Sequence, residues 1–155
     1  MMKRFCRVLF FAIAGFGACS EPVTNDQLIM TIESRFNRIQ DPEKLRNEMQ
    51  WAWNDLKTRP IPAVLDSHAI FLYRGSGKDV RITGDFTGWR PGPHLIQLGK
   101  SDIFALSLKF PDSMRVLYNF IVDGQAAIDS ANVNKATGKF GQCSELRMPR
   151  YKTTP

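Results

Sequence analysis

The stretch that decides the fold of this 155-residue chain is RVLYNFIVDGQ, residues 115–125. Large apolar residues recur in it at every second position, namely Val116, Tyr118, Phe120 and Val122. A period of two is that of a strand with one face buried. Asp123-Gly124 then supplies a two-residue hairpin turn, because Gly accepts the positive φ that such a turn requires. The stretch predicts a long strand that turns directly into the next one.

The same pattern of short alternating runs and turn residues extends to both sides of this stretch, from Ser67 to the end of the chain. Apolar residues alternate again at Phe104, Leu106 and Leu108. Short runs separated by turn residues every eight to twelve positions are typical of an all-β sandwich or barrel. We predict strands over His68–Arg74, Asp79–Thr83, Leu95–Leu98, Ile103–Lys109, Arg115–Val122, Ala126–Asp129 and Ser144–Met148. An oligonucleotide-binding barrel would need aromatic and basic residues interleaved on one exposed face, which residues 115–122 do not have.

Two helices precede the predicted strands. Thr24 and Gln27 resemble a capping box, and an apolar stripe follows at helical spacing, made of Leu28, Ile32, Phe36 and Ile39. Asp41-Pro42 is typical of a helix start, with Asp at the N-cap and Pro at the first helical position. The second stripe is Leu45, Met49, Trp53 and Leu56, and Pro60 and Pro62 end the helix. We expect Trp53 to pack into the core.

The first 19 residues carry targeting information. Three basic residues precede an apolar run over residues 8–16, and small residues follow immediately before Cys19. This order is that of a secretory signal, and the run is too short to span a bilayer. The cysteine after the small residues resembles the lipobox of bacterial lipoproteins, which implies a lipid on Cys19. Ser20 then implies transport to the outer membrane, facing the periplasm. The alternative is an ordinary secretory signal in which Cys19 is incidental.

The charge balance gives little support to a nucleic-acid partner. The chain has 21 basic and 15 acidic residues, but Lys3, Arg4 and Arg7 belong to the predicted signal peptide. Without these three residues the net charge falls from +6 to +3. The three cysteines lack the spacing of a metal site, so we expect no metal and no cofactor.

Four motifs together resemble a known family. They are IFLYRG at 70–75, ITGDFTGW at 82–89, YNFIVDG at 118–124 and SELRMPRY at 144–151. They are similar to the early-set, immunoglobulin-like N-terminal domain of enterochelin-esterase-like hydrolases. That domain is related to the glycogen-binding modules of branching enzymes and of the β subunit of AMP-activated kinase. The resemblance implies an immunoglobulin-like β-sandwich over residues 63–151.

The residues themselves argue against an enzyme. A serine hydrolase needs a nucleophile on a strand-to-helix turn, as in G-x-S-x-G, together with a histidine and an acid. Gly75-Ser76-Gly77 lacks that spacing and reads as a hairpin turn. His68 and His94 have no acidic residue at a sequence spacing that would suggest a catalytic pair. We interpret Asp85, Asp123 and Asp129 as turn-capping residues. We expect no catalytic residue in this chain.

The resemblance implies a sugar-binding site instead. Glycogen-binding relatives use a Trp after the Gly-Asp-Phe turn, a Lys in the Tyr-x-Phe strand and a second Trp after Asp-Gly. Here Trp89 holds the first position, Asn119 replaces the Lys, and Ala126 replaces the second Trp. We take Trp89, Asn119 and Gln125 as candidate carbohydrate-binding residues. The alternative for Trp89 is a structural role in its loop or against a neighbouring domain.

These observations define four segments and a function. We expect a signal peptide over 1–18, a tether and two-helix appendage over 19–62, the sandwich over 63–151 and a tail over 152–155. The predicted function is a membrane-anchored, non-catalytic module that binds a glucan, a glycoconjugate or a partner protein. The alternatives are a remnant or trans-acting accessory domain of a separately encoded esterase, and an envelope lipoprotein that meets a partner protein through its helices.

Overall fold

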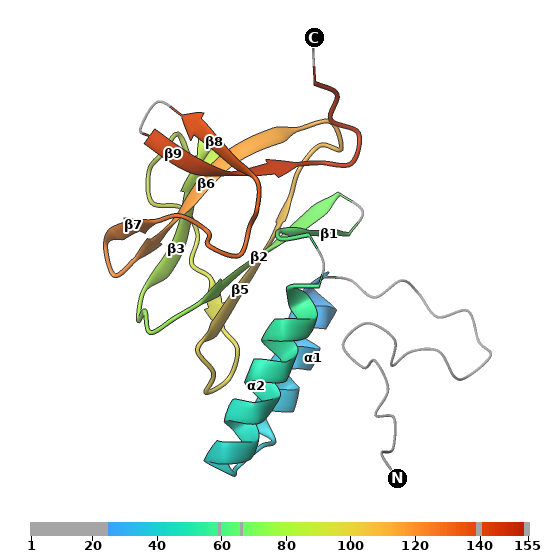
Figure 1. Cartoon of the computed structure of the whole chain (residues 1–155), viewed down its shortest axis with the longest axis vertical. Helices are drawn as coiled ribbons and strands as arrows, with labels where there is room; N and C mark the ends of the chain where they lie inside the picture. Colours follow the sequence, from blue (N-terminus) through green and yellow to red (C-terminus); the bar gives the residue numbers. More distant parts are fainter. Residues whose placement is uncertain (1–24, 59, 66, 139–140, 154–155) are drawn as a thin grey trace, which may run out of the picture.

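Two antiparallel sheets face each other in the computed structural model, which describes residues 25–58, 60–65, 67–138 and 141–153 (Figure 1). The predicted signal peptide, Cys19 and the helix cap at Thr24 lie outside the described residues. None of the described helices is both long and apolar enough to cross a membrane.

The sandwich has four strands in one sheet and five in the other. The first sheet has the order β1 (Ala63–Leu65), β2 (His68–Arg74), β5 (Ile103–Lys109), β4 (Ile96–Gln97). The second sheet has the order β3 (Val80–Gly84), β6 (Arg115–Val122), β9 (Gly141–Arg147), β8 (Lys135–Gly138), and β7 (Gln125–Ala127) also pairs with β6. The predicted all-β sandwich is confirmed.

Strands β2, β5 and β6 have the bounds that the sequence predicts. The other predicted strands differ in their bounds, including the internal strand β9, which begins three residues before the predicted Ser144 and ends at Arg147. Strands β1 and β8, which the sequence does not predict, are only three and four residues long. Edge strands this short lack a readable alternation of apolar and polar residues. The predicted strand over 126–129 corresponds to β7, which begins one residue earlier and ends at Ala127. Asp129 therefore lies beyond the strand, and it is buried.

The predicted hairpin turn after β6 is confirmed. Asp123 and Gly124 have φ values of 49° and 84°, the positive values that a tight two-residue turn requires. The Asp123 carboxylate also accepts hydrogen bonds from the backbone N–H groups of Lys78 and Asp79, at 2.9 and 2.8 Å. This side chain therefore joins the β6–β7 turn to the loop before β3.

Aromatic rings fill the space between the two sheets. Phe71 meets Tyr118 edge to face at 4.8 Å between ring centroids, and Tyr118 meets Phe120 in the same way at 5.9 Å. Such contacts add to the stabilisation from area burial. Ile82 and Val116 complete this layer, and both are fully buried.

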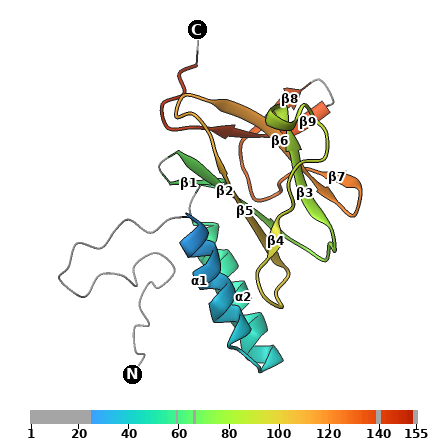
Figure 2. The same ribbon diagram turned by 180° about the vertical axis from the view of Figure 1, so that it is seen from behind.

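Helices α1 (Asn25–Asn37) and α2 (Pro42–Leu56) cover the outer face of the first sheet (Figures 1 and 2). Asp41 caps α2 as predicted, because its carboxylate accepts from the N–H groups of Glu43 and Lys44. Phe36 and Met49 pack with Ile70 and Leu72 of β2 in a second core. Strand β2 is thus buried on both faces, which explains why its apolar run is continuous rather than alternating.

The predicted helical stripes are mostly correct. Ile32, Phe36 and Met49 are buried, whereas Ile39, Leu45 and Trp53 are half-buried, and the side chains of Leu28 and Leu56 lie outside the described part of the structure. Ile29 and Ala52 complete the buried face. Trp53 packs against the core as expected, with the Arg74 guanidinium 5.9 Å from its ring.

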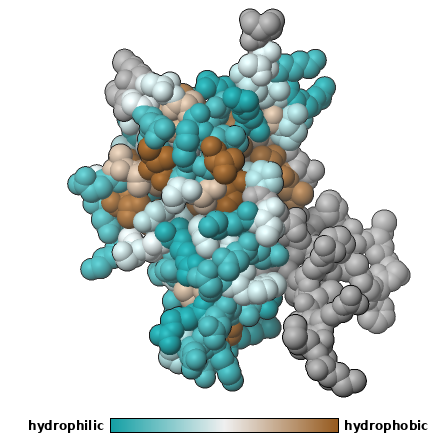
Figure 3. All heavy atoms as spheres, in the orientation of Figure 1, coloured by the Kyte–Doolittle hydropathy of each residue, from teal (hydrophilic) through white to brown (hydrophobic). Residues whose placement is uncertain are grey.

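The outer surface of the helices is mostly polar on the face seen in Figure 3, where hydrophobic side chains gather on the sandwich instead. Met30 and Trp51 are the large apolar side chains that the described part of the helices exposes. The Arg35 guanidinium lies 5.6 Å from the Trp51 ring and covers part of it. A partner-binding helical face therefore has little apolar surface to use.

Candidate functional site

The loop that follows β3 holds Trp89 in an unusual backbone conformation. It begins with a 3-10 turn over Asp85–Thr87, and Gly88 and Trp89 then have φ values of 61° and 62°. Positive φ is uncommon for a bulky residue and costs on the order of 1 kcal/mol. The Trp89 N–H donates to the Gly84 carbonyl at 2.9 Å, which closes the loop.

Gly84 lets this loop approach β6 closely. A Cβ at this position would lie 2.4 Å from the carbonyl oxygen of Leu117, which is a backbone atom that cannot move aside. The Thr87 hydroxyl reinforces the approach by bonding both the N–H and the carbonyl of Gly84, at 3.1 Å each. The Gly-Asp-Phe-Thr sequence therefore fixes where the loop meets the sheet.

Asp85 connects the Trp89 ring to the second sheet. One carboxylate oxygen accepts from the indole Nε1 of Trp89 at 3.1 Å, and the other accepts from the Leu117 N–H of β6 at 2.9 Å. The sequence predicts Asp85 to be a turn-capping residue, but both of these bonds reach beyond its own turn. The half-buried Trp89 ring is thereby held in one orientation beside β6.

Asn119 lies two residues further along β6, on the outer face of the second sheet. Its neighbours Tyr118 and Phe120 point into the core, so the Asn119 side chain points outward. It is half-buried, and among the described residues its Oδ1 has no hydrogen-bond partner. A shielded amide oxygen without a partner is rare in folded proteins.

Gln125 does not share a face with Asn119. It pairs with Val122 of β6, whose side chain packs toward the core, and paired residues of an antiparallel ladder lie on the same face. Ala126 pairs with Ile121 and therefore shares the face of Asn119. The structure thus ties Trp89 to β6 through Asp85, with Asn119 two residues further along that strand, and it places the exposed Gln125 on the other face.

The histidines do not join any of these residues. His68 begins β2, and the exposed His94 places its Nδ1 2.9 Å from an oxygen of Asp79. Within the described ranges, no three His, Cys, Asp or Glu side chains are grouped so that they could hold a metal ion. Gly75-Ser76-Gly77 lies in the connection between β2 and β3, but these strands belong to different sheets, so the predicted hairpin turn is wrong.

A buried polar network is the feature that the sequence analysis missed. The Tyr118 hydroxyl donates to Asp129 at 2.6 Å, and Asn132 donates to the Tyr118 oxygen at 3.1 Å. Asp129 also accepts from the N–H of Ala131, and its own N–H donates to Ser144. Burial raises the pKa of Asp129 despite these bonds. The only sequence signal was Tyr118 in the middle of a core-facing strand, since a buried phenol needs a polar partner.

The fold and the residues around Trp89 define a β-sandwich of the carbohydrate-binding-module type, a class that is not itself catalytic. Residues 68–146 match the family described as the glycogen recognition site of AMP-activated protein kinase, and the chain belongs to this family. The match runs from β2 into β9 and includes both Trp89 and Asn119.

Solved structures with the same fold include enterobactin esterases. The FES enzyme of Shigella flexneri, solved with 2,3-di-hydroxy-N-benzoyl-serine, is 17% identical, and the match covers 67% of this chain and 36% of that chain with a TM-score of 0.55. The ferric enterobactin esterase of Salmonella typhimurium is 16% identical over 68% of this chain and 38% of that chain, with a TM-score of 0.53. The aligned part is therefore little more than a third of each esterase. No curated protein matches the chain significantly.

Proposed function

We propose that this chain is a glycan-binding module held at a bacterial membrane by a lipid on Cys19. The observation that carries the proposal is the Trp89 ring, which Asp85 fixes in orientation at the edge of the second sheet. A sugar exposes C–H groups on its face, and these pack on an aromatic ring held in place beforehand at little cost in entropy. The family membership favours an α-glucan or a related glycoconjugate as the ligand.

Asn119 would complete the site beside Trp89. Its Oδ1 is shielded and has no partner among the described residues, and it would accept a hydrogen bond from a sugar hydroxyl once the amide turns outward, which a Lys at this position could not do. Ala126 on the same face offers no second ring, so one stacking contact on the order of 1 kcal/mol is absent relative to a two-ring site. We expect weak binding that depends on many sugar units along one polymer. Gln125 faces away from this surface and is not part of the proposal.

Replacing Trp89 with alanine is expected to abolish glycan binding without unfolding the domain. The measurement is affinity electrophoresis of the full chain, in an uncharged and sugar-free detergent, through gels that contain glycogen, starch or peptidoglycan fragments. The proposal expects at least one of these polymers to slow the wild type, and the Trp89→Ala variant to run as it does in a plain gel. Trp51→Ala, which removes an exposed ring on α2, is the matched control and should stay retarded.

Absence of retardation in every gel would contradict the glycan proposal. It would favour the second candidate, an accessory domain that works beside a separately encoded esterase. The observation in favour of that candidate is the fold shared with enterobactin esterases, in which the aligned region is only part of the enzyme. Equal loss of retardation in Trp89→Ala and Trp51→Ala would also contradict a site at the Trp89 loop.

Cys19 is expected to carry the membrane anchor. Burial of acyl chains contributes roughly 0.8 kcal/mol per CH₂ group, so several chains on one residue hold a small domain firmly. Cells fed an alkyne analogue of palmitate should label the wild-type chain and a Cys143→Ser variant, but not Cys19→Ser. Cys143 is a free cysteine buried in β9, and the Cys143→Ser variant controls for labelling at a cysteine other than Cys19. An unlabelled wild type that is released as soluble protein would support the ordinary secretory signal instead.

A further inference from the structure

Two arginines stand side by side on the outer face of the second sheet. Arg115 of β6 and Arg147 of β9 are direct partners in the antiparallel ladder, so their side chains share one face. Like charges placed opposite each other in this way destabilise a sheet unless something compensates them. The partial compensation comes from Glu145, whose Oε1 accepts from the Nε of both arginines, at 2.6 and 2.7 Å.

The single carboxylate leaves the pair with a net positive charge. Burial alone would raise the pKa of Glu145, but the hydrogen bonds from Arg147 and Arg115 outweigh it and hold this pKa below its usual range. Glu145 is therefore ionised at neutral pH and balances one of the two guanidinium groups. Its side chain is only 3% exposed, whereas those of Arg115 and Arg147 are 38% and 53% exposed.

Most of the hydrogen-bonding capacity of both arginines is unused. Among the described residues, each guanidinium donates only from its Nε, so the terminal Nη groups are open on both. The Nε bonds to Glu145 fix the two groups next to each other. The Arg147 guanidinium also lies 5.9 Å from the centre of the Tyr151 ring, which restricts it further. Arginines restrained in this way lose little entropy when they bind an anion.

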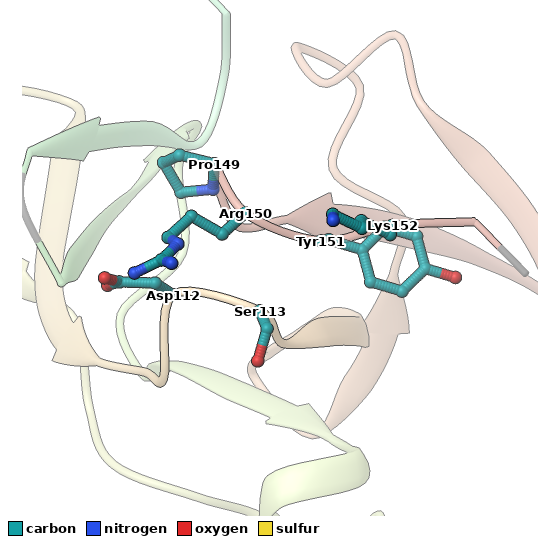
Figure 4. A pocket seen from close by; sticks show the side chains of 6 residues that line it. All are labelled: Asp112, Ser113, Pro149, Arg150, Tyr151 and Lys152. Atoms are coloured by element: carbon teal, nitrogen blue, oxygen red, sulfur yellow. The ribbon is translucent and has the colours of Figure 1, made fainter.

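A hollow of about 760 Å³ lies near this pair, but neither arginine lines it. Tyr151 lies between the hollow and Arg147, and the other lining residues are Asp112, Ser113, Pro149, Arg150 and Lys152. Figure 4 shows Arg150 pointing toward Asp112, while Lys152 lies beside Tyr151. The arginine pair and Glu145 together carry one net positive charge.

We propose that Arg115 and Arg147 bind a phosphate group next to Tyr151. The dianion of a phosphate monoester is favoured, because the attraction of the two guanidinium groups grows with the charge of the anion. Guanidinium groups bind phosphate oxygens through paired N–H donors, and two neighbouring forks reach several oxygens at once. This site involves neither Trp89 nor Asn119, and it stands independently of the glycan proposal.

The test is a calorimetric titration of the full chain with sodium phosphate at pH 8 and low ionic strength, in uncharged detergent. Sodium chloride at matched ionic strength is the blank, and dimethyl phosphate is titrated in parallel as a monoanionic diester. Arg147→Gln and Arg115→Gln are each expected to weaken phosphate binding by about tenfold or more, since each removes a charge-assisted fork. Arg46→Gln, which removes an exposed arginine on α2, should leave binding unchanged.

The outcomes separate the sources of the phosphate group. Binding of phosphate alone supports a monoester such as a phosphorylated sugar, and equal binding of dimethyl phosphate supports the site with a phospholipid headgroup as the source. No heat beyond the chloride blank overturns the proposal, and so does an equal loss in Arg46→Gln, which would indicate general charge attraction. Thermal unfolding of each variant checks folding, and Glu145 keeps one arginine partner in either single variant.

Discussion

Replacing Phe36 with alanine is expected to lower the free energy of unfolding by about 3–5 kcal/mol, the usual cost of removing a buried aromatic ring. Phe36 is 1% exposed and lies in the core between the helices and the first sheet, with Leu72 and Ile103 among its neighbours. The lost ring leaves a cavity that these residues fill only in part. Denaturation in urea measures the change, with the slope checked to be the same as in the wild type.

Met30→Ala is the matched control on the same helix. Met30 is 66% exposed, so its truncation should change the stability by no more than about 0.5 kcal/mol. A loss below about 1 kcal/mol for Phe36→Ala would mean that the helices do not stabilise the sandwich. A large loss in one cooperative transition would show that residues 25–58 and the sandwich fold as a single unit.

Asp129→Ala is expected to destabilise the domain by about 3 kcal/mol at neutral pH. The substitution removes the acceptor of the Tyr118 hydroxyl and of the Ala131 and Asn132 N–H groups. Asp129 and Tyr118 are both buried, so the phenol hydroxyl cannot turn to water instead. Asp129→Asn keeps one acceptor oxygen and should cost only about 1 kcal/mol. Equal losses in the two variants would contradict this account of the network.

The stability conferred by Asp129 is also expected to depend on pH. Because burial raises the pKa of Asp129 in the folded state, the folded chain holds this proton more tightly than the unfolded chain does. Its contribution is therefore largest below the unfolded pKa of about 3.9 and falls as the pH rises through the raised value. The stability of the wild type relative to Asp129→Asn should decrease from pH 3.5 to pH 7.5.

Comparison with Asp129→Asn at each pH isolates this carboxylate from the other acids. Glu145 and Asp123 have lowered pKa values and change the stability in the opposite direction, but they do so in both proteins. A wild type that gains stability over the Asn variant as the pH rises would mean that the fold favours the ionised form of Asp129.

Local patterns were enough to predict most of the elements. The alternation over residues 115–122 gave β6 its bounds, and Asp123-Gly124 gave the turn that follows it. Asp41-Pro42 predicted the start of α2. In each case the signal lies within a few neighbouring residues, because backbone preference and side-chain period are local properties. Short edge strands such as β8 carry no such signal, which is why they were missed.

Local sequence patterns predicted the candidate site only in part. The two motifs containing Trp89 and Asn119 could be read from the sequence, and the structure links Trp89 through Asp85 to β6, the strand that carries Asn119. It was the register of β7 against β6 that turned Gln125 to the other face, since a shift of one residue exchanges the two faces of a strand. The bonds of Asp85 to Trp89 and Leu117 likewise required the loop to dock on β6.

The sequence by itself determined an all-β domain preceded by two amphipathic helices, because periodicity and turn chemistry act over short distances along the chain. Only the tertiary structure decided that the helices cover the first sheet, that Asp129 is buried under Tyr118, and that Arg115 meets Arg147. These residues are far apart in the sequence, and strand register and packing bring them together. Contacts of this kind depend on the whole fold, which no short stretch of sequence specifies.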